Sequence, residues 1–267
     1  MRRIRRTFFL FVFTCLVGVA AFMFWPEPHI PEPEMQEDRS RLELLSIEPA
    51  GSHITQHTYQ FPGGERPALY LYEMSPSEVA LDLEERPEGP FILQWPLADD
   101  ILLVNGFYFT ETMAAAGRLW DEGEVTGGQA YDPERTAVVR LHPNPAIIDT
   151  TNAPLEELDM EEGGQTFPLL IKDGSPAVKE DSGRLARRTF IGFDEEGQLY
   201  IGIVPHHYLS LYTLSQLLPT TKIRWNMVAN LDGGPSTGVF VPDGTSVDSF
   251  TPIPNVIRVR AATERGS

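Results

Sequence analysis

Short apolar runs, each bounded by Gly, Pro, Asn or Asp, recur along most of the chain and constrain its fold more than any other feature. Runs of this length that are rich in Val, Ile, Tyr and Phe are typical of β-strands. The pattern predicts strands at 68–74, 79–83, 101–109, 136–141, 167–174, 188–194, 198–204 and 256–260. The stretch "RTFIGFDEEGQLYIGIV" predicts a hairpin, because "DEEG" separates two alternating segments.

Helical periodicity is clear in one segment, "SLYTLSQLLPT" at 210–220. Its leucines recur at helical spacing and the pattern ends at Pro219, which predicts an amphipathic helix of about three turns. A further strand in "IRWNMVAN" follows it. With no internal repeat or second shift in composition, the sequence predicts an α+β fold. We expect a single mixed domain over 41–261, with a largely antiparallel sheet and few helices, and a tail at 262–267.

The N-terminal segment differs from this pattern. Residues 7–25 contain no charge, and a helix of that length, at about 1.5 Å per residue, nearly spans a hydrocarbon core of roughly 30 Å. Arginines precede it, which predicts a cytoplasmic N-terminus and export of everything after Trp25. The competing interpretation is a cleaved signal peptide, since Val19 and Ala21 are small enough for a cleavage site. Both place the domain in the periplasm or outside the cell, anchored in the first case and secreted in the second.

Residues 26–40, "PEPHIPEPEMQEDRS", are rich in proline and acid, which predicts an extended linker between the segment at 1–25 and the domain. Cys15 is the only cysteine, so the exported part has no disulfide and no thiol chemistry. The net charge of −17 repels nucleic acid phosphates, which argues against a nucleic-acid partner. No protein partner is predicted; the membrane is expected as a partner through 7–25.

One short stretch has the composition of a binding loop: "NLDGGPSTG", from Asn230 to Gly238. An Asp before two glycines often only turns the chain after a strand, because glycine accepts positive φ and the carboxylate caps nearby N–H groups. The functional alternative is that Gly233 and Gly234 let a ligand approach the backbone while Ser236 and Thr237 bind anionic or sugar oxygens. It is not a Walker loop, because no "GK[ST]" follows.

"NLDGGPSTG" resembles the "NLDGG-x-S" hallmark of the phosphodiester glycosidase family. Further segments resemble motifs of that family in the same order: "VNGFYF" at 104–109, "FPLLIKDG" at 167–174, "RRTFIGFDEEGQLYIGIV" at 187–204, "LSLYTLSQLL" at 209–218 and "PIPNVIRVR" at 252–260. Together they cover about 100–260. The sequence departs from the family at "NGFYF", "PSTG" and "PHHY", which puts the identity of the substrate in question.

The resemblance implies hydrolysis of a sugar 1-phosphodiester, in cell-envelope or exopolysaccharide material if the domain is exported. Asp232 is then the expected nucleophile or base at the anomeric carbon, and Arg188 the expected clamp on the phosphate. Substrate binding is expected from Asn105, Asn230, Gly233, Gly234, Ser236 and Thr237. Read without the resemblance, Arg188 is more typical of a solvated surface charge and Asn105 of a turn residue. A second carboxylate is left open among Glu111, Asp173 and Asp194.

No cofactor and no metal is predicted. His206 and His207 are adjacent, so on a strand they point to opposite faces and do not share an ion easily. The acidic "DEGE" at 121–124 lacks EF-hand spacing. The alternative from another class is a membrane-tethered domain that binds a sugar phosphate without cleaving it. Geometry distinguishes the two: in an enzyme the side chains of Asp232, Arg188, Asn105 and Ser236 converge on one open pocket. Scattered side chains, or a Phe107 ring that fills the pocket, count against catalysis.

Overall fold

The computed structural model describes residues 38–96, 99–126, 134–151 and 160–262. The chain divides into two compact units, Met1–Gln36 and Glu37–Ser267. The predictions for residues 7–25, and for most of the linker at 26–40, lie outside the described residues. No helix in the described part of the chain is long and apolar enough to cross a membrane. All that follows concerns the second unit.

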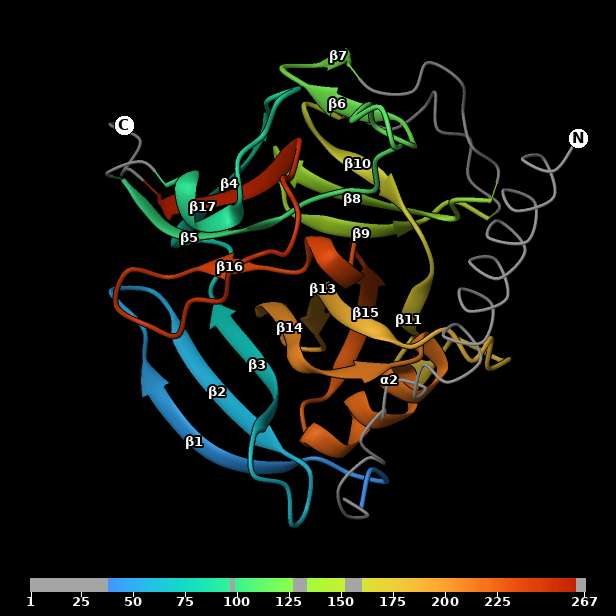
Figure 1. The fold of residues 1–267 in the computed structure, drawn as a ribbon. Coiled ribbons are helices and arrows are strands. Elements are labelled where there is room, and N and C mark those ends of the chain that lie inside the picture. The colour runs from blue at the N-terminus through green and yellow to red at the C-terminus, as the bar shows by residue number, and fades with distance from the viewer. Residues whose placement is uncertain (1–37, 97–98, 127–133, 152–159, 263–267) are drawn as a thin grey trace, which may run out of the picture. The chain divides into compact units, whose positions relative to one another are not determined.

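The described residues of this unit form three antiparallel sheets (Figure 1). The largest has eight strands in the order β1-β2-β3-β14-β13-β15-β11-β12. Its strands are β1 (Glu43–Pro49), β2 (Thr55–Gln60), β3 (Pro67–Met74), β11 (Leu169–Lys172), β12 (Ser175–Pro176), β13 (Ala186–Asp194), β14 (Leu199–Leu209) and β15 (Trp225–Asn230). The mixed domain expected from the sequence is therefore dominated by antiparallel sheet.

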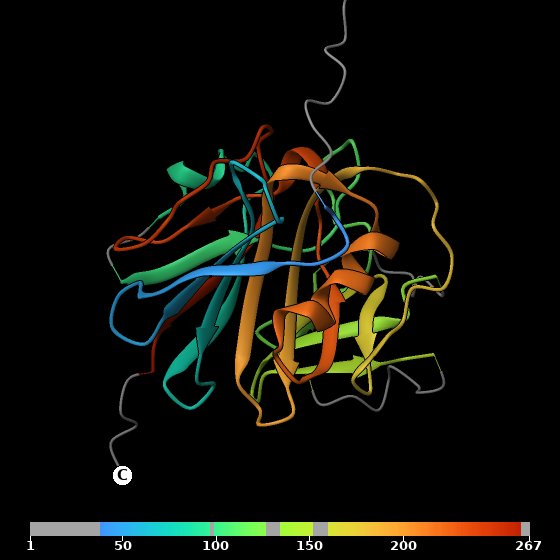
Figure 2. The ribbon, with the colours of Figure 1, turned by 90° about the horizontal axis from the view of Figure 1, so that it is seen from below.

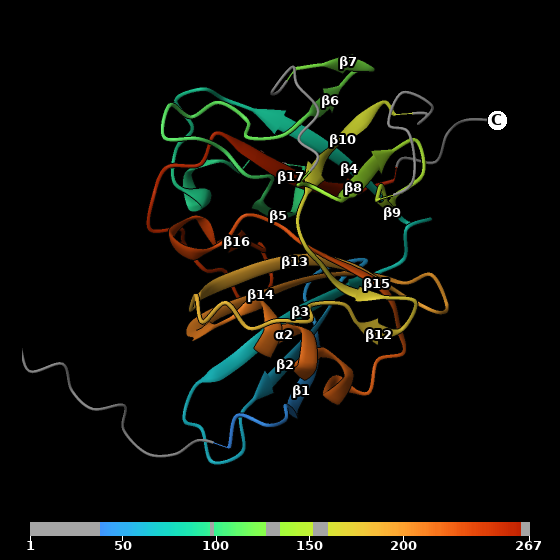
Figure 3. The same ribbon diagram turned by 90° about the vertical axis from the view of Figure 1, so that its right-hand side faces the viewer.

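Two smaller sheets accompany it. One has the order β7-β6-β10-β8-β9 and the other β16-β5-β17-β4. Their strands are β4 (Val79–Glu85), β5 (Asp100–Asn105), β6 (Leu119–Asp121), β7 (Glu124–Val125), β8 (Ala137–His142), β9 (Ala146–Asp149), β10 (Glu162–Thr166), β16 (Val239–Phe240) and β17 (Asn255–Ala261). Figure 3 shows both smaller sheets on one side of the large sheet and α2 (Leu211–Leu217) on the other.

Two apolar cores follow from this layering. The larger core is shared by one face of the large sheet, through Ile191 and Ile203, and by the smaller sheets, through Val104 and Val139. The second core fills the opposite face of the large sheet, where α2 packs beside the strands (Figure 2). Residues on β13 alternate between these two cores, as the period of a strand requires. Side chains of β13 are therefore buried on both faces.

The expected hairpin and helix are confirmed, with changes at their ends. β13 and β14 pair antiparallel from Phe193 opposite Leu199. Helix α2 begins after Ser210, whose hydroxyl accepts from the Thr213 N–H, and gives way to the 3₁₀ turn η3 (Leu218–Thr221). Two further 3₁₀ turns are η1 (Ile92–Gln94) and η4 (Gly234–Ser236). The run expected as a strand at 101–109 remains a strand only to Asn105, because the chain then leaves the sheet to enter the site described below.

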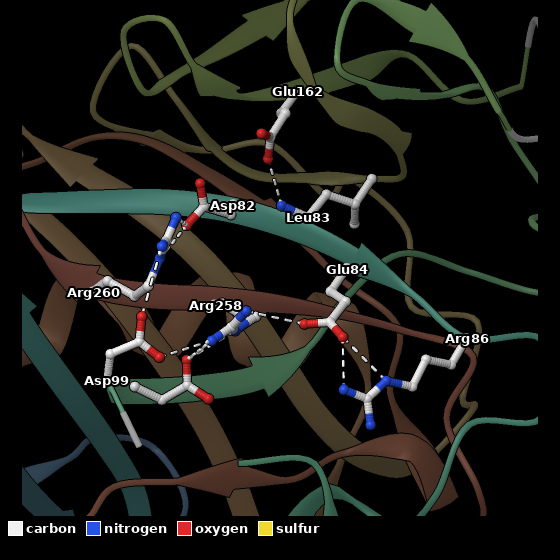
Figure 4. A network of polar contacts seen from close by, with 9 residues as sticks. Asp82, Leu83, Glu84, Arg86, Asp99, Glu162, Arg258 and Arg260 are labelled. Carbon is white, nitrogen blue, oxygen red and sulfur yellow. Dashed lines mark hydrogen bonds and ion pairs between the residues drawn. The ribbon is translucent and has the colours of Figure 1, made fainter. Parts of the chain in front are cut away.

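A ladder of ion pairs crosses β4, β17 and the start of β5 (Figure 4). Arg258 on β17 pairs with Asp100 at 2.6 Å, with Glu84 at 3.1 Å and with Asp99 at 3.3 Å. Arg260 pairs with Asp82 at 2.5 Å on the same face. Glu162 on β10 accepts from the Leu83 N–H at 2.6 Å, so its carboxylate joins the two smaller sheets.

Candidate active site

The "NLDGGPSTG" loop begins where β15 ends and turns through η4. The Asp232 N–H donates to the Gly106 carbonyl oxygen at 3.1 Å, which ties the loop to the end of β5. A Cβ on Gly233 would lie 3.0 Å from the Arg187 carbonyl oxygen, and Gly234 has a φ of +64°. Close approach explains the first glycine and a left-handed conformation the second. Gly234 thus adopts the positive φ expected of a turn glycine, and Gly233, which does not, brings the loop against the start of β13.

The Asp232 carboxylate is half-buried at this position. Burial raises its pKa to about 6, against the effect of three groups that favour the carboxylate: the Ser236 hydroxyl, the Gly233 N–H and the charge of Arg135. A carboxyl group that is partly desolvated, but whose oxygens still accept hydrogen bonds, titrates close to neutral pH. This is the property that general acids and bases need.

Asn105 hydrogen-bonds to this loop at Asp232 and at Gly238. Its side-chain amide donates to the Asp232 carbonyl oxygen at 2.7 Å. Its Oδ1 accepts from the Thr189 hydroxyl at 2.8 Å and from the Gly238 N–H at 3.1 Å. Thr237 is also buried, with its hydroxyl 3.3 Å from that of Thr189. The structure shows Asn105 and Thr237 positioning the loop from inside the protein; their direct contact with a substrate stays a prediction.

Tyr108 lies beside Asn230 and Arg135 and is a further polar residue of the site. Its hydroxyl donates to the Phe167 carbonyl oxygen at 2.9 Å and accepts from the Asn230 side-chain amide. The Arg135 guanidinium lies 4.9 Å from the centroid of the Tyr108 ring. Burial and the charge of Asp232 raise the pKa of Tyr108, while Arg188 and Arg135 oppose that shift. Tyr108 is thus within electrostatic reach of the carboxylate and of both arginines.

Arg188 is buried, which corrects its reading as a solvated surface charge. Its Nε donates to the Leu209 carbonyl oxygen at 2.8 Å and its Nη2 to the Arg184 carbonyl oxygen at 2.6 Å. Burial lowers its pKa, although the guanidinium stays charged at any physiological pH. Within the described residues no carboxylate forms an ion pair with it. A positive charge anchored by carbonyl oxygens and left without a counter-ion is suited to hold an anionic group.

Asp232, Arg188, Asn105 and Ser236 therefore come together. Ser236 and Asn105 hydrogen-bond to Asp232 itself, and a Cβ on Gly233 would lie 3.7 Å from the Arg188 Cα. The Phe107 ring is buried in the larger core, so it does not occupy this site. Phe107 does not fill this site, whereas an open pocket lined by the four side chains stays a prediction.

Comparison with known proteins agrees with this arrangement. The family model of phosphodiester glycosidases (NAGPA) matches residues 99–260. The chain belongs to the phosphodiester glycosidase family. The resemblance inferred from the sequence motifs is thereby confirmed, and the site lies inside the matched region. Membership places this chain in a family of hydrolases that act on phosphodiester-linked sugars.

Two solved structures share the fold of this chain. A hypothetical protein from Synechocystis is 15% identical, with a TM-score of 0.56 over 83% of this chain and 68% of that chain. The zebrafish N-acetylglucosamine-1-phosphodiester alpha-N-acetylglucosaminidase (NAGPA) catalytic domain, described as auto-inhibited by its pro-peptide, is 14% identical, with a TM-score of 0.56 over 86% of this chain and 85% of that chain. At such identities the likeness concerns the fold. No curated protein matches the sequence.

None of the three carboxylates left open by the sequence lies beside Asp232 in the structure. Asp194 accepts from the Glu196 and Gln198 N–H groups in the hairpin turn, at the other end of β13 from Arg188. Asp173 is exposed in a turn with a φ of +49°, and Glu111 is exposed in a loop. Of the described carboxylates, none is among the groups that shift the pKa of Asp232. The described part of the site thus contains one carboxylate.

Metal-binding geometry is not found in the described part of the domain, where no three His, Cys, Asp or Glu side chains gather around a common point. His206 is exposed and His207 is buried, so the two rings lie on opposite faces of β14, as expected for neighbours on a strand. Asp121 and Glu124 belong to the β6–β7 hairpin, whose turn contains Glu122 and Gly123.

Tyr108 and Arg135 are the site residues that the sequence analysis missed. Tyr108 lies within the quoted "VNGFYF", where only the bulk of Phe107 drew attention. Arg135 precedes β8 and belongs to no local sequence pattern, because its contact with Tyr108 joins two separate segments of the chain. Asn230 was expected to bind substrate, and the structure shows it donating to Tyr108 and, at 3.1 Å, to the Phe167 carbonyl oxygen.

Proposed function

We propose that this protein hydrolyses a sugar 1-phosphodiester and releases the sugar and a phosphomonoester. The observation that carries the proposal is the single half-buried carboxylate of Asp232, with its pKa near 6, beside a tyrosine that two arginines flank. Family membership supports the reaction class. The zebrafish relative's title names an N-acetylglucosamine 1-phosphodiester, which supports that sugar as the first substrate to test.

The chemistry needs little acid catalysis. A phosphodiester leaves as a weakly basic phosphomonoester, so the protein must stabilise negative charge more than it must supply a proton. In the proposed step the bond between the anomeric carbon and the phosphate oxygen breaks, and its electron pair stays on the phosphate beside Arg188. The oxygen of water ends on the anomeric carbon.

Asp232 acts in its ionised form in this proposal. As base it takes the proton of the attacking water; as nucleophile it bonds to the anomeric carbon until water displaces it. The Ser236 hydroxyl and the Gly233 N–H orient the carboxylate oxygens in either case. Gly234 and Thr237 support the turn that presents these donors, and Arg135 favours the ionised form.

The decisive experiment measures sugar release from an N-acetylglucosamine 1-phosphodiester by the purified full chain and by Asp232→Asn. We expect turnover by the parent and its loss in a variant that stays folded by circular dichroism. Binding of sugar 1-phosphodiesters without turnover by the parent would instead support the non-catalytic binding domain.

We further propose that the domain is exported and acts on cell-envelope or exopolysaccharide material. The uncharged stretch at 7–25 and the arginines before it support this. A reporter fused after Ser267 that is active only outside the cytoplasm tests the orientation. Activity of a cytoplasm-specific reporter at the same position contradicts it.

A further inference from the structure

Arg187 is a buried cation that the proposed reaction does not use. It precedes Arg188 on β13 but is 2% exposed, and burial lowers its pKa. Its Nη2 donates to the Asp248 carbonyl oxygen at 3.1 Å, whereas its Nε and Nη1 have no hydrogen-bond partner within the described residues. Burying a guanidinium with unused donors is costly, so a fold that retains one needs another source of stabilisation.

The charge of Asp248 supplies part of that stabilisation, and an aromatic ring supplies another part. The Arg187 guanidinium lies 4.1 Å from the centroid of the Phe250 ring, close enough for a strong cation–π contact. Yet the Phe250 residue is 66% exposed, more than any other large hydrophobic residue described. One face of the ring is therefore fixed against the charge while the rest is open to solvent.

Phe250 is also fixed to the catalytic loop. Its N–H donates to the Pro235 carbonyl oxygen at 2.7 Å, and Pro235 belongs to η4, the turn whose Ser236 hydroxyl binds Asp232. Pro235 is three positions after Asp232 along the chain, which limits the distance between the two residues to at most ~10 Å. A separation within this limit leaves room for a phosphate and one sugar ring.

A second aromatic side chain lies close by. Tyr208 on β14 is 53% exposed, and its interaction with Arg187 is among the causes that raise the pKa of that arginine against burial. Arg187 thus has two exposed aromatic residues near it, beside a loop that already carries the carboxylate. Flat, exposed aromatic faces suit the C–H faces of a sugar, because the negative face of the ring attracts the slightly positive C–H groups.

We propose that the Phe250 ring, held by Arg187, is a stacking platform for a second sugar ring on the phosphate side of the bond that is cleaved. The proposal rests on the proposed function and deepens it by naming Phe250 as the residue that selects a leaving group carrying a sugar. The positive charge beneath the platform also favours the anionic phosphomonoester that carries this sugar, so the platform and the phosphate clamp select one kind of product.

The test compares two N-acetylglucosamine 1-phosphodiesters, one with a methyl group and one with a hexose on the phosphate. Phe250→Leu keeps an apolar cover on Arg187 but removes the aromatic face. We expect it to lower kcat/KM on the hexose diester about 3- to 10-fold more than on the methyl diester, through KM. Phe250→Tyr keeps the face and restores the preference. Ile47→Ala, which truncates an exposed apolar residue on β1, changes neither substrate.

Equal losses on both substrates, or no loss on either, would overturn the platform. The proposed function fails separately, if the parent turns over neither diester. In that case calorimetric binding of the hexose diester to the parent and to Phe250→Leu decides the platform alone: a 3- to 10-fold weaker variant supports it, and equal affinity overturns it.

Discussion

The side-chain amide of Asn105 donates to the carbonyl oxygen of Asp232 at 2.7 Å, so the end of β5 fixes the backbone of the catalytic residue. Asn105→Ala removes this donor and leaves the buried Gly238 N–H without its acceptor. We expect a loss of unfolding free energy of about 2–4 kcal/mol, measured by urea titration, together with a fall in kcat. A variant as stable as the parent would show that the loop does not depend on this residue.

Activity should rise with pH around the pKa of Asp232. Since burial raises that pKa to about 6, and the proposed step uses the ionised carboxylate, kcat/KM increases as pH passes upward through about 6. A pH–rate profile on the sugar 1-phosphodiester checks this. A rate that instead declines as pH rises through 6 would make Asp232 a general acid.

The same carboxyl links stability to pH. Its folded-state pKa of about 6 lies above the ordinary 3.8, so the folded protein binds the proton more tightly than the unfolded chain. This contribution is present in full below pH 3.8 and is lost as pH rises through 6. Relative to the parent, Asp232→Asn should therefore gain about 2–3 kcal/mol between pH 4 and pH 7. Glu111→Gln, at an exposed acid, should follow the parent; a flat difference for Asp232→Asn would contradict the shift.

The ion-pair ladder provides a matched pair of substitutions. The Arg258 side chain is 12% exposed and pairs with Asp100, whose side chain is 0% exposed, so Arg258→Met deprives a buried carboxylate of this cation. We expect a cost of about 3–5 kcal/mol. Arg260→Met removes a side chain that is 39% exposed and should cost about 1 kcal/mol or less. Thermal unfolding of both variants measures the difference, and similar costs would refute the role of burial.

Strands could be predicted from the sequence wherever apolar and polar residues alternate or where the whole run is apolar. The β13–β14 hairpin and β3 were predicted because their side chains pack on at least one core. The strand β10, "EGGQT", carries no apolar alternation and was missed, although it lies between β6 and β8. The edge strand β1 is exposed along most of its length, and its neighbour β2, "TQHTYQ", is mostly polar, so both were missed for the same reason.

The site followed only in part. Asp232 and Ser236 lie in one loop, so their association was readable along the chain. Arg135 contacts Tyr108 from the segment before β8, and no local sequence pattern predicts a contact between segments so far apart in the chain. The burial of Asn105 could not be predicted either, because the same "NG" pair is equally typical of an exposed turn.

Gly164 on β10 limits which side chains relatives of this chain can have at two positions of the core. A Cβ at Gly164 would lie 2.7 Å from the Phe107 ring and 2.5 Å from Leu119, so the large side chain at 107 fits only because position 164 has none. The Phe107 ring occupies the space that a side chain at position 164 would need. Relatives with a small residue at the position of Phe107 have room for a side chain opposite it, and we expect the two positions to covary, with a double exchange tolerated where either single exchange is not.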